Sequence, residues 1–209
     1  MVKKASKSSS KTVKSICYKI CLVKHLSSWS KKRSVASRYN VTSESYDEQY
    51  AQEQAAKYQV VQSVLESSFN DVVLDVGCGS GLFFSHVAGK VQSVVGVDIS
   101  HKLLLKAKAH AKSLCNVYIV QADADHLPFK NVVFDVVFSF TMLQNMPDPK
   151  KSLLEFKRQT KAGGKLVVTG LKKAFELTVF LDLFEAAHMR LLEFVDDSNL
   201  KCYIAIAEV

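Results

Sequence analysis

Five apolar runs of strand length alternate with helical segments between residues 72 and 170. The runs are VVLDV at 72–76, SVVGV at 93–97, VYIV at 117–120, VVFDVVFSF at 132–140 and KLVVTG at 165–170. Strands that are apolar along their whole length and are separated by helices are typical of a parallel sheet covered on both faces. The sequence therefore predicts an α/β domain.

Further elements are expected on either side of this core. Residues 45–67 carry apolar side chains at spacings of three and four, which predicts a helix before the first strand. Ser100 and Asp148 stand as N-caps before two of the crossover helices, and Gly163 is expected to end the second. Two strand-like runs in the last 21 residues are separated only by residues 196–199, so they should form an antiparallel hairpin. We expect a mixed seven-stranded sheet of five parallel strands and this hairpin.

Basic residues concentrate in the first forty positions. These positions hold 11 of the 28 Lys and Arg residues and no acidic residue, so they carry +11, whereas the other 169 residues carry −3. Such a Ser-rich and Lys-rich composition predicts that residues 1–40 are mostly disordered, around a basic amphipathic helix near residues 13–24. The segment could be an arm for RNA or an anionic surface, an organelle-targeting peptide, or a poorly constrained extension. The predicted division is a tail at 1–40, a helical cap at 41–70 and a core domain at 71–209.

The cysteines and the lengths of the apolar runs indicate in which kind of compartment the protein is expected. The five cysteines are an odd number without metal-ligand spacing, which indicates free thiols in a reducing compartment and no metal site. No apolar run approaches the ~20 residues of a bilayer-spanning helix. The expected location is the cytoplasm, with an organelle as the alternative if residues 1–40 are a targeting peptide.

The most informative segment is VVLDVGCGSG at 72–81, followed by a helical run. A strand that leads through a glycine-rich turn into a helix brings backbone N–H groups close to a ligand. A dinucleotide site is excluded because Leu82 or Phe84 stands where the third glycine is required, and a phosphate-binding loop is excluded because Gly-Lys-Ser/Thr is absent.

The remaining pattern, Asp75-x-Gly77-x-Gly79-x-Gly81, resembles the class I S-adenosylmethionine-dependent methyltransferases. The resemblance runs from about residue 71 to residue 209, because VVGVDIS, QADADHLPF and FDVVFSFTMLQNMPDP follow in the family's order. It includes features of the type 11 and quinone-methyltransferase groups. It implies a Rossmann-like doubly wound sheet with S-adenosylmethionine as cofactor.

The resemblance also implies roles for individual residues. The loop from Asp75 through Cys78 to Gly81 would hold the methionine part of the cofactor. Asp98, followed by Ile99, would accept the ribose hydroxyls, since a carboxylate can accept from two donors at once. Further cofactor contacts are implied for the adenine-binding pair Asp123 and Ala124, for Phe140 in the loop facing the methyl group, and for Tyr46 on the preceding helix. Singly, each of these residues could equally be an ordinary strand end, turn or packing residue.

No catalytic residue is identified, because methyl transfer from a sulfonium chiefly requires alignment of the reactants. Gln144, Asn145 and Lys172 are candidates on the substrate side. The loop after the fourth strand lacks Asn-Pro-Pro-Tyr, which disfavours methyltransferases of planar amino groups. The sequence leaves no room for a lid after the fifth strand, so we favour a macromolecular acceptor, tRNA or protein, or a protein partner that completes the site. The alternatives are a small acceptor such as a quinone precursor and a non-catalytic cofactor-binding scaffold subunit.

Overall fold

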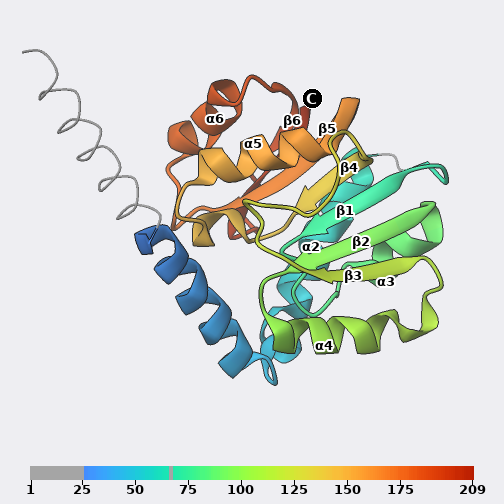
Figure 1. The fold of residues 1–209 in the computed structure, drawn as a ribbon. Coiled ribbons are helices and arrows are strands. Elements are labelled where there is room, and N and C mark those ends of the chain that lie inside the picture. The colour runs from blue at the N-terminus through green and yellow to red at the C-terminus, as the bar shows by residue number, and fades with distance from the viewer. Residues whose placement is uncertain (1–25, 66–67) are drawn as a thin grey trace, which may run out of the picture.

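The computed structural model describes residues 26–65 and 68–209, which form a seven-stranded sheet between layers of helices (Figure 1). The strand order is β3-β2-β1-β4-β5-β7-β6. The strands are β1 (Val72–Val76), β2 (Ser93–Asp98), β3 (Val117–Gln121), β4 (Phe134–Ser139), β5 (Thr160–Leu171), β6 (Arg190–Val195) and β7 (Cys202–Glu208). Strands β1 to β5 pair in parallel, and β7 lies antiparallel between β5 and β6. The predicted mixed sheet and terminal hairpin are confirmed.

Helices bury apolar residues against both faces of the sheet. One core packs α2 (Tyr46–Val64), α3 (Phe84–Val87) and α4 (His101–His110) against residues of β1, β2 and β4. The other core packs α5 (Pro149–Gln159) and α6 (Leu177–Ala186) on the opposite face. Short 3-10 turns are η1 (Ala88–Lys90), η2 (Ala111–Ser113) and η3 (Leu143–Asn145). The carboxyl ends of the parallel strands are therefore left open at one edge, where α/β sheets bind ligands.

Two helix starts follow the predicted capping chemistry, but one helix end does not. The Ser100 hydroxyl accepts from the backbone N–H of Leu103, and the Asp148 carboxylate accepts from that of Lys151. Helix α5 stops at Gln159 rather than at Gly163, because the chain already joins strand β5 at residue 160. Gly163 lies inside that strand at a φ of 74°, and its N–H donates to the carbonyl of the last residue at 2.7 Å.

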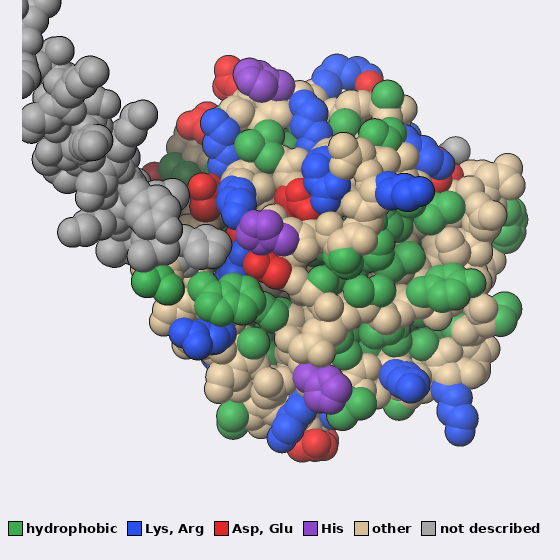
Figure 2. Space-filling model, in the orientation of Figure 1, with side chains coloured by type: hydrophobic (Ala, Val, Ile, Leu, Met, Phe, Trp, Pro, Cys, Tyr) green, Lys and Arg blue, Asp and Glu red, His purple; other side chains and the backbone are tan. Residues whose placement is uncertain are grey.

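A helix over residues 26–42 corrects the expected extent of the disordered tail (Figure 1). The composition argument fails over residues 26–40 because this helix is stabilised by contacts with the core domain rather than by a core of its own. Lys32, for example, is only 5% exposed. The amphipathic helix expected near residues 13–24 lies outside the described residues. Basic side chains are also found away from this helix, since Figure 2 shows Lys and Arg gathered over α5.

Within residues 26–65 and 68–209, no helix combines the length and apolarity that crossing a bilayer requires.

Candidate active site

The glycine loop turns the chain from β1 into α3 at the open edge of the sheet. Gly77, Gly79 and Gly81 have φ values of 79°, 57° and 80°, a region that side chains disfavour. A Cβ at Gly77 would lie 2.6 Å from Cγ of Met142, so glycine is also required there for space. The backbone N–H groups of Gly77 and Cys78 both donate to the Val97 carbonyl, at 2.7 and 3.0 Å. The loop is thus fixed to the end of β2.

Asp98 ends β2 and binds this loop. Its Oδ2 accepts from the Gly79 N–H at 3.0 Å, and its Oδ1 accepts from the Ser100 N–H at 2.7 Å. Burial raises the pKa of the Asp98 carboxyl, although both N–H donors lower it. The carboxylate lines a cavity, so its remaining lone pairs face a space in which a diol could donate to them.

Asp75, in β1, is a buried carboxyl without a neutralising partner. It is 2% exposed, and its side chain makes no hydrogen bond or ion pair with any other described residue. Burial, assisted by the nearby charge of Asp98, raises its pKa to about 8. The pKa of the Tyr58 hydroxyl is raised mainly by burial and further by the charge of Asp75. The carboxyl lines a small cavity beside the glycine loop, where a cationic ligand group would stabilise its ionised form.

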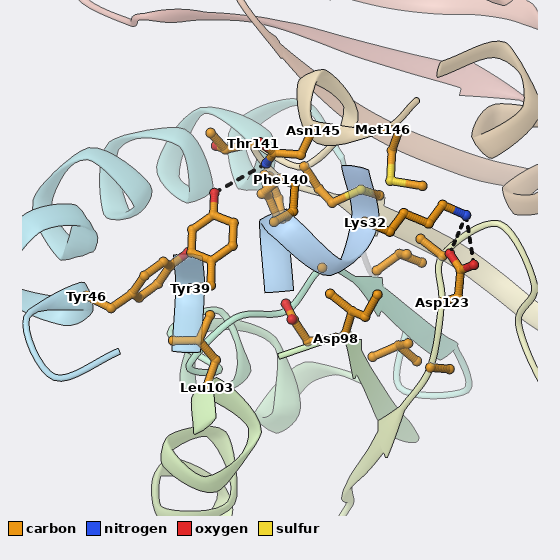
Figure 3. A pocket seen from close by; sticks show the side chains of 18 residues that line it. Lys32, Tyr39, Tyr46, Asp98, Leu103, Asp123, Phe140, Thr141, Asn145 and Met146 are labelled. Atoms are coloured by element: carbon orange, nitrogen blue, oxygen red, sulfur yellow. Dashed lines mark hydrogen bonds and ion pairs between the residues drawn. The ribbon is translucent and has the colours of Figure 1, made fainter. Parts of the chain in front are cut away.

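A larger cavity, here called the cofactor cavity, lies beyond the ends of β1, β2 and β4 (Figure 3). It adjoins the small cavity of Asp75, because Tyr46, Gly77 and Phe140 line both. Its walls combine apolar and polar side chains with two strand-end carboxylates. The lining residues are Lys32, Val35, Tyr39, Tyr46, Val76, Gly77, Val97, Asp98, Ile99, Leu103, Ala122, Asp123, Ala124, Phe140, Thr141, Met142, Asn145 and Met146.

The helix over residues 26–42 forms a roof over the cofactor cavity. Lys32 reaches down from it, and its ammonium contacts both Asp123 oxygens at 2.8 Å and Asp125 Oδ2 at 2.6 Å (Figure 3). Burial alone would raise the pKa of the Asp123 carboxyl, but hydrogen bonds led by that from Lys32 hold it below its usual value. Lys32 therefore stabilises the ionised form of Asp123 at this edge of the cavity.

Other side chains of the same helix fix it across the cavity. Lys31 Nζ donates to the Met146 carbonyl at 2.8 Å, and Arg38 Nη2 donates to Asn145 Oδ1 at 2.9 Å. Asn40 Oδ1 accepts from a backbone N–H in the first turn of α4 at 3.1 Å. The roof is thus bound to the loop after β4 on one side and to α4 on the other.

The loop after β4 is held in an unusual backbone conformation. Thr141 has a φ of 55°, which is uncommon for a β-branched residue. Its N–H donates to Thr169 Oγ1 at 2.7 Å, and its Oγ1 accepts from Lys57 Nζ at 2.7 Å. Lys57, in α2, is fully buried and also binds Glu53 Oε1 at 2.8 Å. Buried interactions from α2 and β5 therefore fix the position of Thr141.

A second cavity, here called the acceptor cavity, opens between α2, the roof helix, the loop after β4 and the end of β5. Tyr39, Tyr46, Thr141 and Asn145 line both cavities, so the two spaces meet at these residues. Gln144 also lines the acceptor cavity, and its Oε1 atom is buried without a hydrogen-bond partner among the described residues. The other lining residues are Arg38, Thr42, Gln49, Tyr50, Glu53, Gln54, Leu171, Lys172, Lys173, Ala174 and Lys201.

The residues proposed from the sequence divide among these cavities. Eight line the cofactor cavity: Tyr46, Gly77, Asp98, Ile99, Asp123, Ala124, Phe140 and Asn145. Asp75 and Cys78 line the adjoining small cavity, whereas Gln144 and Lys172 line the acceptor cavity. Gly79 is a backbone donor to Asp98. Gly81 instead faces the Phe84 ring and the Ala107 backbone, so its position serves helix packing. The roles of all these residues in ligand binding stay predictions.

Sequence reasoning missed several residues of the site. Lys32 and Tyr39 were assigned to the tail, although residues 32, 35, 39 and 42 share one helical face at spacings of three and four. That spacing was a usable signal. Lys57 and Glu53 lie on the predicted helix before the first strand, but nothing in their local sequence indicates that Lys57 binds Thr141 in the loop after β4 or that Glu53 binds Lys57 and Lys201.

Comparison with known proteins places the site in a family context. A family model described as a methyltransferase domain matches residues 74–168. The chain is 33% identical over 150 residues to the tRNA U34 carboxymethyltransferase of Pseudoalteromonas atlantica, covering 70% of this chain and 46% of that protein. It is 32% identical over 142 residues to the malonyl-[acyl-carrier protein] O-methyltransferase of Hamiltonella defensa, covering 67% and 53%. The chain thus spans about half the length of these curated relatives.

A third relative and two solved structures are also methyltransferases by name. Identity to the demethylmenaquinone methyltransferase of Staphylococcus saprophyticus is 37% over 97 residues, covering 45% of this chain and 42% of that protein. An Aquifex aeolicus SAM dependent methyltransferase matches with a TM-score of 0.65 at 19% identity, covering 71% of this chain and 87% of that one. A putative methyltransferase in complex with the Haloferax volcanii Trm112 methyltransferase activator matches with a TM-score of 0.68 at 15% identity. The match covers 81% of this chain and 96% of that one. These structures share the fold. Residues 74–168 thus match a methyltransferase domain, within a chain that has the fold of a solved S-adenosylmethionine-dependent methyltransferase.

Proposed function

We propose that this protein is an S-adenosylmethionine-dependent methyltransferase with an acceptor site of its own. The observation that carries the proposal is the junction of the two cavities at Tyr39, Tyr46, Thr141 and Asn145. One cavity is lined by the glycine loop and strand-end carboxylates, and the other opens toward solvent beside it. A methyl donor in the first and an acceptor in the second would meet at this junction.

The chemistry of the donor set fits this cofactor. Asp75 is a buried carboxyl without a partner among the described residues, so it suits the ammonium of the methionine part. Asp98 is already fixed by two backbone donors and has lone pairs left for the ribose hydroxyls. Asp123 and Ala124 line the cofactor cavity just after the end of β3, where the adenine would bind.

The protein's own residues would accelerate methyl transfer mainly by aligning the donor with the acceptor. When bound, S-adenosylmethionine supplies an activated methyl group, and transfer is an in-line displacement. Thr141, fixed by Lys57 and Thr169, and Tyr46 would define the short passage between the cavities. Holding the acceptor at near-attack distance can supply roughly 7 to 11 kcal/mol of the barrier. Gln144 and Asn145 would orient the acceptor by hydrogen bonds rather than exchange protons with it.

The acceptor that fits best is a small molecule. The absence of a lid after β5 favoured a macromolecule at the level of the sequence, but the roof helix encloses the passage from the other side. Such enclosure excludes water, which a small acceptor requires. A tRNA or protein acceptor, with a site completed by an activator subunit, is the second candidate, since two relatives are named as a tRNA U34 carboxymethyltransferase and a malonyl-[acyl-carrier protein] O-methyltransferase.

Two measurements test the proposal. Calorimetry with S-adenosylhomocysteine should show binding, and incubation with methyl-labelled S-adenosylmethionine and a source-cell extract should label a small-molecule fraction. Asp98→Ala should abolish both signals. Label in RNA or protein would favour the second candidate. Binding of S-adenosylhomocysteine without any labelled product would favour a non-catalytic scaffold, and no binding at all would refute the assignment.

A further inference from the structure

We propose that the acceptor is a small anion, with a carboxylate or phosphate group bound between Arg38 and Lys173 in the acceptor cavity. This inference rests on the proposed function and adds the chemical class of the substrate. It places the anionic group at the solvent side of the cavity and the nucleophilic atom at the junction beside Tyr46 and Thr141.

The charges lining the acceptor cavity are unbalanced. Four cationic side chains line it, Arg38, Lys172, Lys173 and Lys201, against the single carboxylate of Glu53. A cavity lined by one sign of charge attracts and retains ligands of the opposite sign. An anionic acceptor therefore fits this wall, whereas a cationic acceptor would face repulsion from several directions.

The carboxylate of Glu53 does not offset this excess of positive charge, because it is already paired with two lysines. Glu53 accepts from Lys57 Nζ at 2.8 Å and from Lys201 Nζ at 3.1 Å. Burial acts to raise the pKa of Glu53, but these two lysines hold it below its usual value. Lys172 is likewise engaged, with Asp196 at 2.6 Å. Lys201 and Lys172 are thus neutralised within the structure.

Two cations remain without an acidic partner among the described residues. Arg38 donates only to the neutral Asn145 amide and lies over the Tyr39 ring, with Cζ 4.9 Å from its centroid. Lys173 is exposed and makes no hydrogen bond or ion pair with another described residue. A guanidinium presents a planar fork that matches carboxylate and phosphate oxygens, and an ammonium adds a mobile point charge. These two side chains are the groups available to an anionic substituent.

The wall of the acceptor cavity beside Arg38 is aromatic. The ring centroids of Tyr39 and Tyr46 are 5.9 Å apart, and those of Tyr46 and Tyr50 are 4.9 Å apart. Tyrosine faces bury the apolar body of a ligand while their hydroxyls remain available for hydrogen bonds. An acceptor with an apolar body between its anionic group and its nucleophile would therefore contact every part of this wall. This order of contacts favours a small acid over an RNA backbone, which would require cations along a longer track.

The test supplies the acceptor as a chemically defined fraction. The low-molecular-weight part of a source-cell extract is divided on an anion exchanger into retained and unretained fractions, and each is incubated with the full-length protein and methyl-labelled S-adenosylmethionine. We expect labelled product from the retained fraction alone. Label derived from the unretained fraction, from RNA or from protein would overturn the proposal.

Charge variants then connect the effect to the named residues. Lys173→Glu should raise the amount of retained fraction needed for half-maximal rate by about 10- to 100-fold, because a favourable charged contact becomes repulsive. Arg38→Gln should act in the same direction. Lys112→Glu makes the same charge change at an exposed lysine outside both cavities and should have no effect. Equal half-saturation in Lys173→Glu and Lys112→Glu would overturn the proposal.

A measurement of cofactor binding distinguishes failure of the anionic-acceptor proposal from failure of the proposed function. Calorimetry with S-adenosylhomocysteine is run on the wild type and on Lys173→Glu, whose side chain does not line the cofactor cavity. Binding by both proteins, with labelled product only from the unretained fraction, RNA or protein, overturns the anionic-acceptor proposal alone. Binding with no labelled product from any fraction favours a non-catalytic scaffold and overturns both proposals. Absence of binding by the wild type overturns the proposed function beneath it.

Discussion

Binding of S-adenosylhomocysteine should release close to one proton at pH 7, and Asp75 should be its source. In the free protein, burial and the charge of Asp98 raise the pKa of Asp75 to about 8. The ligand carries an ammonium that the proposed function places against this carboxyl. An ammonium at contact distance stabilises the carboxylate, so the pKa of Asp75 falls in the complex and the proton leaves.

The size of the effect follows from that pKa. A carboxyl with a pKa of about 8 is roughly 90% protonated at pH 7, so binding releases ~0.9 proton there if the pKa falls well below 7 in the complex. Affinity should then rise about ninefold between pH 6 and pH 7 and about fivefold between pH 7 and pH 8. The ionisation of Asp75 costs about 1.4 kcal/mol at pH 7, which the ammonium contact must exceed.

Calorimetry in buffers of different ionisation enthalpy measures this proton directly. The matched control is Asp75→Asn, which keeps the shape of the side chain but cannot ionise. In that variant, affinity should be weaker at pH 8 and nearly constant from pH 6 to pH 8. The pKa of Asp98 is also raised, so any proton that the Asp75→Asn variant still releases on binding measures the contribution of Asp98. A wild type that releases no proton, or a variant that releases as much, would refute the reasoning.

The stability of the free protein gives an independent check on the same pKa. Because the folded-state pKa of Asp75 is raised above its unfolded value, the carboxyl favours folding most at low pH. That contribution is lost as pH rises from about 4 through about 8. Asp75→Asn should therefore melt at a higher temperature than the wild type at pH 8, and the difference should shrink at pH 5. Equal melting temperatures at both pH values would show that Asp75 is ionised throughout.

Three further substitutions test the geometry of the site. Asp98→Ala removes the carboxylate proposed to accept two ribose hydroxyls and should weaken S-adenosylhomocysteine binding by at least about 100-fold, measured by calorimetry. Gly77→Ala introduces a Cβ 2.6 Å from Met142 Cγ at a positive φ, so it should lower the denaturant midpoint, and Met142→Ala should restore part of the loss. Lys32→Met leaves Asp123 facing a second carboxylate without a cation, so amide exchange in residues 26–42 should accelerate; unchanged protection would contradict the role given to this ion pair.

The fold was predictable because its signals are local and repeated. Each parallel strand is an apolar run bounded by polar residues, and Ser100 and Asp148 cap their helices through side-chain oxygens in the sequence positions that capping requires. The end of α5 was misplaced because Gly163 marks a helix stop only when the chain does not join a strand first. Strand β5 begins at residue 160 through pairing with β4, which no local pattern at residues 160–163 reveals.

The candidate site was predictable only where ligand contacts follow strand ends. Asp98 and Asp123 stand at or just after such ends, and the glycine spacing identified the loop that follows β1. Lys32 was missed for a physical reason. A composition argument asks whether a segment can bury enough apolar surface by itself, but this lysine is ordered by carboxylates about ninety residues away in sequence. Lys57 was missed similarly, since its partner Thr141 lies on another element.

The roof helix connects the two cavities energetically as well as spatially. Lys32 faces the cofactor cavity, Arg38 faces the acceptor cavity, and Tyr39 lines both. A ligand at either end would add contacts to the same helix in the same position, so the second ligand would meet a roof that the first has made more stable. The two binding free energies must then be coupled, and the coupling is reciprocal. Cofactor and acceptor would therefore each bind more tightly in the presence of the other, through a segment whose composition alone resembles a tail.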